Sequence, residues 1–131
     1  MSETEQNRIK ISTQPEESPV QKLLELAVQE QVKGNLTKAE AIYQQILIAA
    51  PNQVVALHML GLIAYQSGNS GTAEELITKA LKIQPTYTDA HINLGYIFSE
   101  LGRLEEAAEC YVNALALNPD DADVLVNRAN L

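Results

Sequence analysis

The feature that most constrains the fold of this chain is a repeat of 34 residues. Pro51, Pro85 and Pro119 are spaced by this interval. A fixed period in this range indicates stacked units, each of which buries its apolar face only against its neighbours. Other residue types follow the same period in five further series: Gly34, Gly68 and Gly102; Gly61 and Gly95; Ala39, Ala73 and Ala107; Tyr43, Ile77 and Tyr111; and Leu47, Leu81 and Leu115.

Each unit predicts two helices joined by a tight turn. In the second unit, apolar and small residues recur at helical spacing over residues 54–67 and again over 72–84. Turn residues at 68–71 separate these segments, and Pro85 ends the second one. Connections this short require neighbouring helices to pack antiparallel. The same pattern predicts helices over residues 20–33, 37–50, 88–101 and 104–118, and an incomplete one near 122–131.

The glycines at 61 and 95 have a predicted packing role. Each lies where a first helix meets its partner, opposite the alanines of the second helix. Small side chains allow the two backbones to approach closely, and a bulky residue there would overpack the crossing.

The chain is expected to form one repeat domain behind a polar leader. Residues 1–18 are rich in Glu, Gln, Ser and Thr and predict a flexible segment. Residues 19–131 form the domain, with repeats at about 20–53, 54–87 and 88–121 and a partial repeat at 122–131. The partial repeat would expose Val124, Leu125 and Leu131 unless a partner, a second copy or further chain covers them.

Composition excludes several classes of function. The formal net charge is −8, so the surface repels phosphate backbones and we expect no nucleic acid partner; a basic peptide suits it better. No stretch reaches the roughly 18 apolar residues of a membrane span, and residues 1–19 lack the apolar core of a secretion signal. We therefore expect a cytoplasmic location and no membrane partner.

No catalytic residue, cofactor or metal site is expected. The single cysteine, Cys110, allows neither an internal disulfide nor a cysteine-based zinc set. His91 falls in the same unit, but a packed histidine and a small buried cysteine explain the pair better than a catalytic thiol does. The glycines follow the repeat rather than the spacing of a phosphate-binding loop.

The period and these positions resemble the tetratricopeptide repeat family, over about residues 20–131. The family pattern places an aromatic residue, Leu-Gly, Tyr, Ala, an aromatic residue, Ala and Pro at fixed offsets. The resemblance implies an all-α fold: a right-handed superhelical stack of antiparallel helix hairpins (an α-solenoid), with three full repeats plus the first helix of a fourth. The third unit matches with His91, Leu94-Gly95, Phe98, Ala107, Tyr111, Ala114 and Pro119; the second with Leu57, Leu60-Gly61, Ala64, Ala73, Ile77, Ala80 and Pro85; and the first, more degenerate, with Leu23, Leu26-Ala27, Glu30, Ala39, Tyr43, Ile46 and Pro51.

The resemblance also implies a concave groove lined by the first helices, typical of a scaffold for protein–protein interactions. The groove would be largely apolar and would bind a protein or peptide, as an apolar or amphipathic segment. Self-assembly through the groove or the C-terminal helix, or cover by Ile9 and Ile11 of the leader, are the alternatives. The residues expected to contact the partner are Leu24, Val28, His58, Met59, Leu62, Tyr65, Ile92, Asn93, Tyr96 and Asn127.

Two more specific modes of binding can be weighed from the residues. Asn93 and Asn127 are 34 residues apart, and an asparagine amide can pair with both groups of a peptide main chain. The carboxylate clamp of some family members needs basic groove residues; this chain has Asp89 and apolar residues there, so that mode is rejected. As an alternative to a stand-alone adaptor, the chain could be the N-terminal targeting or substrate-recruiting module of a larger enzyme, such as a glycosyltransferase or methyltransferase.

Overall fold

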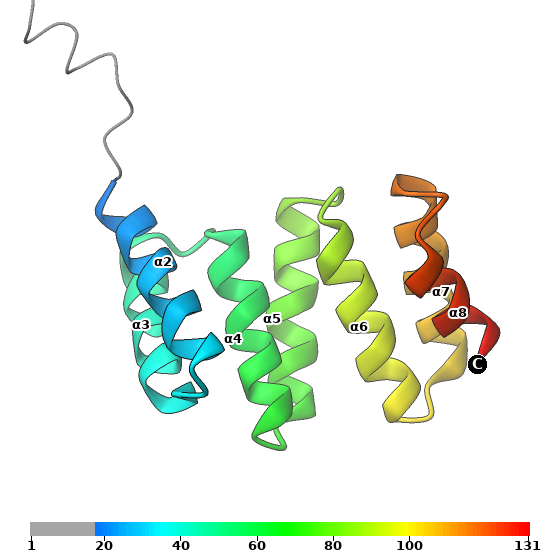
Figure 1. Cartoon of the computed structure of the whole chain (residues 1–131), viewed down its shortest axis with the longest axis horizontal. Coiled ribbons are helices and arrows are strands. Elements are labelled where there is room, and N and C mark those ends of the chain that lie inside the picture. The colour runs from blue at the N-terminus through cyan, green and yellow to red at the C-terminus, as the bar shows by residue number, and fades with distance from the viewer. Residues whose placement is uncertain (1–17) are drawn as a thin grey trace, which may run out of the picture.

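A computed structural model describes residues 18–131 of the chain, so Ile9 and Ile11 lie outside the described residues. This part folds into helices alone, which confirms the all-α prediction. Figure 1 shows them following one another along the long axis of the molecule. The helices are α2 (Pro19–Val32), α3 (Leu36–Ala49), α4 (Val54–Gln66), α5 (Ser70–Ile83), α6 (Thr88–Glu100), α7 (Leu104–Leu117) and α8 (Ala122–Ala129).

The helices form three antiparallel hairpins, α2–α3, α4–α5 and α6–α7, followed by α8. Contacts are most extensive within each hairpin, and smaller interfaces join α3 to α4, α5 to α6 and α7 to α8. A stack in which each unit contacts only its neighbours is a solenoid. The fold is therefore the helical repeat solenoid that the 34-residue period predicts.

Helix ends follow local sequence, with one deviation at α5. Gly68 has a φ of +88°, a left-handed conformation that favours glycine and ends α4. Ser70 and Gly71 were expected in the turn, but they form the first residues of α5. The expected turn over 68–71 is thus too long, because Gly68 alone reverses the chain and Asn69 is then the residue before the helix. Packing from Ala73 onward outweighs the poor helix propensity of Gly71.

The helices approach closely at Gly61 and Gly95 as predicted, but the side chains that face these glycines are Ile77 and Tyr111 rather than the alanines. A Cβ built on Gly61 would lie 2.7 Å from Cγ1 of Ile77 and 3.3 Å from the backbone oxygen of Ala73. A Cβ on Gly95 would lie 2.7 Å from Cε1 of Tyr111. The facing side chains are buried, so the crossings have no room for a methyl group.

Replacing Gly61 with alanine should therefore lower the free energy of unfolding. Overpacking costs about 1–3 kcal/mol, which exceeds the gain of about 1 kcal/mol in helix propensity. Gly71 provides the matched control: it is helical, and a Cβ there meets nothing within 4 Å. The Gly71→Ala variant should be unchanged or slightly more stable. Urea denaturation of both variants measures the difference, and equal effects would contradict the close approach at Gly61.

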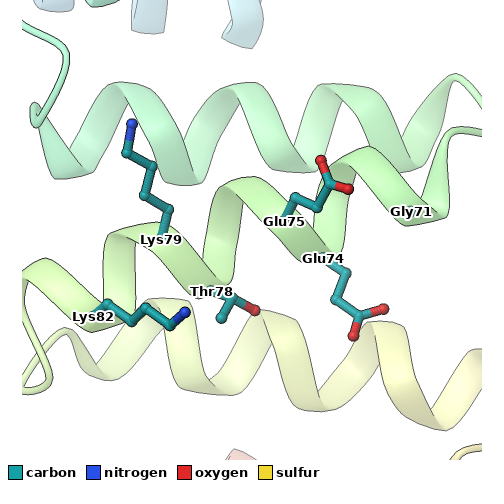
Figure 2. Close-up of a pocket in the computed structure, with 6 residues that line it drawn as sticks. All are labelled: Gly71, Glu74, Glu75, Thr78, Lys79 and Lys82. Atoms are coloured by element: carbon teal, nitrogen blue, oxygen red, sulfur yellow. The ribbon is translucent and has the colours of Figure 1, made fainter.

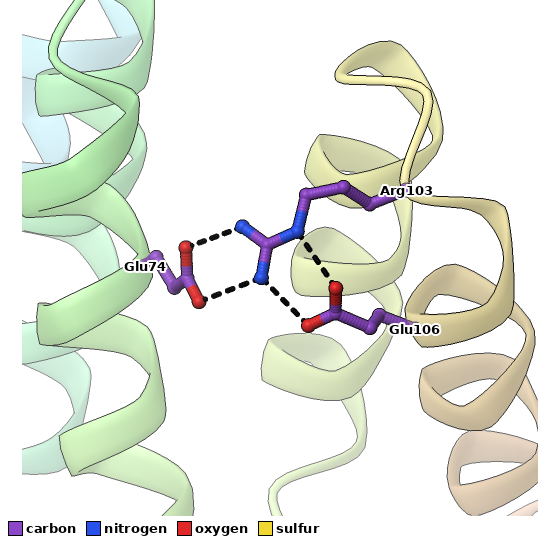
Figure 3. Close-up of polar contacts among 3 residues, drawn as sticks. All are labelled: Glu74, Arg103 and Glu106. Atoms are coloured by element: carbon purple, nitrogen blue, oxygen red, sulfur yellow. Dashed lines mark hydrogen bonds and ion pairs between the residues drawn. The ribbon is translucent and has the colours of Figure 1, made fainter.

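A charged cluster joins the second hairpin to the third (Figure 3). The Arg103 guanidinium donates from Nη1 and Nη2 to the two carboxylate oxygens of Glu74, at 2.7 and 3.1 Å. It also donates from Nε and Nη2 to Glu106, at 2.8 and 2.6 Å. Its Cζ lies 4.4 Å from the centroid of the Phe98 ring. Arg103 thus contacts α5, α6 and α7 together, and it fixes the relative position of two hairpins.

The last helix corrects one expectation about exposed apolar residues. Val124 was expected to be exposed, but it is fully buried in the same core as Tyr111 and Ala114. Because α8 is the first helix of a fourth unit, it docks on α7 as α6 docks on α5. Leu125 and Leu131 remain exposed at 46% and 37%, as expected.

Candidate functional site

The first helices of the three hairpins face a common hollow of about 380 Å³. No residue of a second helix lines this hollow, so it lies on the side of the stack that the first helices form. We call this surface the concave groove. The central hollow is lined by Gln31 from α2, Leu62, Tyr65 and Gln66 from α4, and Asn93, Tyr96 and Ile97 from α6.

Two further hollows extend the concave groove toward its ends. One, of about 460 Å³, lies between α2 and α4, and Leu24, Glu25 and Val28 contribute to its wall. The other, of about 280 Å³, lies among α6, α7 and α8, and its wall includes Glu100 and Asn127 together with Leu104 and Tyr111 of α7. Tyr96 lines both this hollow and the central one. The groove is thus a row of three depressions along the stack.

The residues expected in the concave groove differ in how far they reach solvent. Val28 and Tyr96 are 39% and 48% exposed. Leu24 is buried and forms part of a hollow's wall, so it can contribute only its tip. The exposed apolar surface is therefore smaller than the sequence suggests. The others, apart from His58, are half-buried: Met59, Leu62, Tyr65, Ile92, Asn93 and Asn127.

The structure corrects the position of His58. Its side chain was expected to face the groove and contact a partner or water, but it is only 1% exposed. Its Nδ1 lies 2.9 Å from the Tyr87 hydroxyl, and its Nε2 lies 2.8 Å from Nδ2 of Asn93. Burial, opposed in part by the charge of Asp89, lowers the pKa of His58 to about 4. His58 is thus a neutral internal residue behind the groove wall.

The contact with His58 also fixes Asn93. The amide nitrogen of Asn93 can only donate, so Nε2 of His58 accepts, and Nδ1 carries the proton and donates to Tyr87. The Asn93 amide keeps its oxygen and a second N–H for other contacts. Asn93 and Asn127 line different hollows, with Tyr96 in the walls of both. A clamp formed by both asparagines remains a prediction.

Tyr87 is the residue that sequence reasoning missed. The equivalent residues of the other units are Gln53 and Asp121, whose side-chain oxygens accept from the first backbone N–H groups of α4 and α8. Tyr87 precedes α6 in the same way but makes no such hydrogen bond. Its ring meets the His58 ring edge-on, with centroids 4.9 Å apart. The break in the capping pattern was the available signal.

A second surface lies on α5, the second helix of the second hairpin (Figure 2). All six residues that line it come from α5, so one helix and not a cleft between elements forms it. Glu74, Glu75, Lys79 and Lys82 supply charges of both signs, and Glu74 is already bound by Arg103. Mixed charges on one helix are typical of a solvated face.

Neither Cys110 nor His91 is arranged for nucleophilic chemistry. Cys110 is buried, and burial, followed by the charges of Glu109 and Glu106, raises the pKa of its thiol to about 11. His91 is also buried, and its Nε2 lies 2.8 Å from the carbonyl oxygen of Pro85. Among residues 18–131, no group of three or more His, Cys, Asp or Glu side chains could hold a metal ion. In the same part of the chain, no helix has the length and apolar character to cross a bilayer.

Comparisons with known proteins agree with this architecture. The model of a protein family, described as the middle TPR-like domain of cilia and flagella-associated protein 70, matches residues 23–126. No curated protein sequence matches the chain.

Solved structures of repeat proteins also superpose on the chain. An O-GlcNAc transferase from Thermobaculum terrenum is 30% identical with a TM-score of 0.79; the match covers 83% of this chain but only 21% of the transferase. The first TPR of Spaghetti (RPAP3), bound to the HSP90 peptide SRMEEVD, is 22% identical with a TM-score of 0.79, over 85% of this chain and 88% of that one. MamA is 18% identical with a TM-score of 0.79, over 94% and 71%.

Proposed function

We propose, from the premise that this chain belongs to the tetratricopeptide repeat family, that it is a protein-interaction module whose concave groove binds an apolar or amphipathic segment. The observation that carries the proposal is the row of three hollows, two lined by first helices and the last also by α7, with half-exposed Tyr96 between two of them. A segment laid along this row would contact all three hairpins and α8. The chain itself would contribute no chemistry, and a cytoplasmic location remains part of the proposal.

The groove offers both anchors and hydrogen bonds. A tyrosine side chain has a large apolar ring that a ligand can cover and a hydroxyl that water can solvate. It therefore suits a surface that is exposed to water when no ligand is bound. Leu62, Tyr65 and Tyr96 would supply apolar contact, and the free amide groups of Asn93 and Gln66 would pair with main-chain groups of the segment. This combination fits an extended or helical peptide better than it fits a small polar metabolite.

Alanine at Val28 or Tyr96 should weaken binding of a groove ligand without unfolding the chain. Both side chains are partly exposed, so their truncation costs the fold little, but each would remove apolar surface from the contact with the ligand. Loss of one buried anchor weakens such complexes by about 2 kcal/mol or more, which is roughly thirtyfold. The measurement is fluorescence anisotropy with a peptide selected on the wild-type chain, with circular dichroism as the control for folding. Unchanged affinity in both variants would remove the groove from the proposal.

A second candidate is that the chain recruits substrates for a larger enzyme. The observation that favours it is the 30% identity to the O-GlcNAc transferase, of which the chain spans about a fifth. Both candidates use the same groove, and they differ in whether the repeat domain is part of a larger enzyme. The length of the natural reading frame decides between them.

Self-assembly is the remaining use of the exposed apolar residues. Leu125 and Val126 of α8 are 46% and 56% exposed. If a second copy covers them, light scattering of the wild-type chain should give twice the monomer mass, and Val126→Glu should return it to the monomer.

A further inference from the structure

The concave groove carries negative charge and no compensating cation. Glu25 lines the first hollow and Glu100 the last, and both are exposed. Asp89 on α6 is also exposed; burial lowers the pKa of His58, and the negative charge of Asp89 opposes this effect in part. No lysine or arginine is among the residues that line the three hollows.

The basic side chains of the described residues include several that are already engaged elsewhere. Lys33 and Lys38 approach the Glu30 carboxylate at 3.8 and 3.5 Å. Arg103 is held by two carboxylates at the junction of the second and third hairpins. Lys79 and Lys82 project from α5 (Figure 2). Among residues 18–131, no ion pair involves Glu25, Asp89 or Glu100, so these charges are free to act on a ligand.

Two aromatic rings and a carboxylate line the central hollow and the last one, which share Tyr96. Tyr65 lines the central hollow, Glu100 lines the last one, and Tyr96 lines both. Partial burial, followed by the charges of Glu100 and Tyr96, raises the pKa of the Tyr65 phenol. An aromatic face attracts a cation, and lysine and arginine side chains are also long enough to place apolar carbons on the ring.

We propose that the ligand segment is basic, and that one of its lysine or arginine side chains binds against Tyr65 and Tyr96 with its charge directed to Glu100. This inference rests on the proposed function, because it names the chemistry of the segment that the groove binds. Attraction between an acidic groove and a basic segment also raises the association rate and decreases with salt.

Selection from a random library of displayed 12-residue peptides tests the inference. The probe is the full chain, and the acidic peptide SRMEEVD serves as a control that should not bind. Selected peptides that bind through the groove should be enriched in lysine and arginine relative to the library. Replacing the critical cation with an uncharged residue of similar length should weaken binding roughly three- to tenfold.

Charge reversal at Glu100 locates the cation. The Glu100→Lys variant should weaken the same peptides about tenfold or more, since it replaces attraction by repulsion. Glu75→Lys is the matched control: it makes the same charge change on the exposed surface of α5 (Figure 2) and should leave affinity nearly unchanged.

The outcomes separate the inference from the proposed function. Peptides that lose binding with Tyr96→Ala, but are not enriched in cations or are indifferent to Glu100→Lys, overturn the basic-ligand inference and leave the groove as a binding site. Peptides that lose equal affinity with Glu75→Lys show a non-specific effect of net charge and also overturn it. Selected peptides that are indifferent to both Val28→Ala and Tyr96→Ala overturn the proposed function itself.

Discussion

Replacing Tyr111 with alanine should lower the free energy of unfolding by about 3–5 kcal/mol, the cost typical of deleting a buried aromatic ring. The ring is 1% exposed and lies directly on the backbone of α6, where three of its atoms would come within 3.0 Å of a Cβ at Gly95. Its removal leaves a cavity between α6 and α7 that neither backbone can fill. Native domains are stable by only about 5–15 kcal/mol, so this loss is a large fraction of the total. Since the lost ring belongs to the third hairpin, we expect that hairpin to unfold first in the Tyr111→Ala variant.

Urea denaturation followed by circular dichroism measures this loss, and Tyr96→Ala provides the control. Tyr96 of α6 lines the same hollow as Tyr111 but is 48% exposed, so its truncation should change the free energy of unfolding by no more than about 0.5 kcal/mol. Gly95→Ala should destabilise the wild-type chain but not the Tyr111→Ala variant, because the ring that it would strike is absent. Additive effects of the two substitutions would show that the ring and the glycine do not share one crossing.

The fold was predictable from the sequence because the units repeat the residues that end helices and the small residues at which helices pack closely. Gly68 stops a helix, Pro85 stops the next, and Gly61 with Ala73 allows the two to pack closely. The two stop signals depend only on the residue and its immediate neighbours, and the packing signal depends only on the next helix of the same hairpin, so none of them requires knowledge of contacts between units. Gly68, Pro85 and Ala73 have equivalents at 34-residue spacing in all three units, and Gly61 has one in the third, which removes the ambiguity of any single signal.

The details of the candidate site were less predictable because they depend on contacts between units. His58 and Asn93 are 35 residues apart, and His58 and Tyr87 are 29 apart. Spacing along one helix places His58 on the groove side, but only the approach of the next hairpin shows that Tyr87 and Asn93 cover it. Val124 illustrates the same limit, since its burial depends on how α8 docks on α7.

The stability of the chain should depend on pH through His58. Above its ordinary pKa of 6.5, His58 is neutral in the folded and the unfolded chain. Between pH 6.5 and about 4 the unfolded chain binds a proton that the folded chain does not, so acidification favours unfolding in this window. At 1.36 kcal/mol for each pKa unit, the contribution lost by about pH 4 is roughly 2–3 kcal/mol.

The His58→Gln variant isolates this contribution from that of the carboxylates. Glu30, whose pKa is lowered first by its hydrogen bond from Asn35, and Glu106, bound by Arg103, lose their stabilising charge at lower pH in both chains. Subtracting the two denaturation curves at fixed ionic strength removes these groups and the net charge. The wild-type chain alone should lose stability between pH 6.5 and 4.5; parallel curves would contradict the buried neutral state of His58.

Protonation of His58 should also change the concave groove, because His58 contacts Asn93 in the groove wall. Nε2 of His58 accepts from the Asn93 amide only while it is unprotonated, so a proton on Nε2 places two donors 2.8 Å apart. The amide must then rotate to present its oxygen to His58, which turns its N–H groups toward the hollow that it lines with Leu62 and Tyr96. The NMR signals of the Asn93 side-chain amide should therefore move with the His58 titration near pH 4, whereas those of Asn127 should not. If Asn93 stays unchanged while His58 titrates, the two side chains are not coupled and the groove wall is independent of the buried histidine.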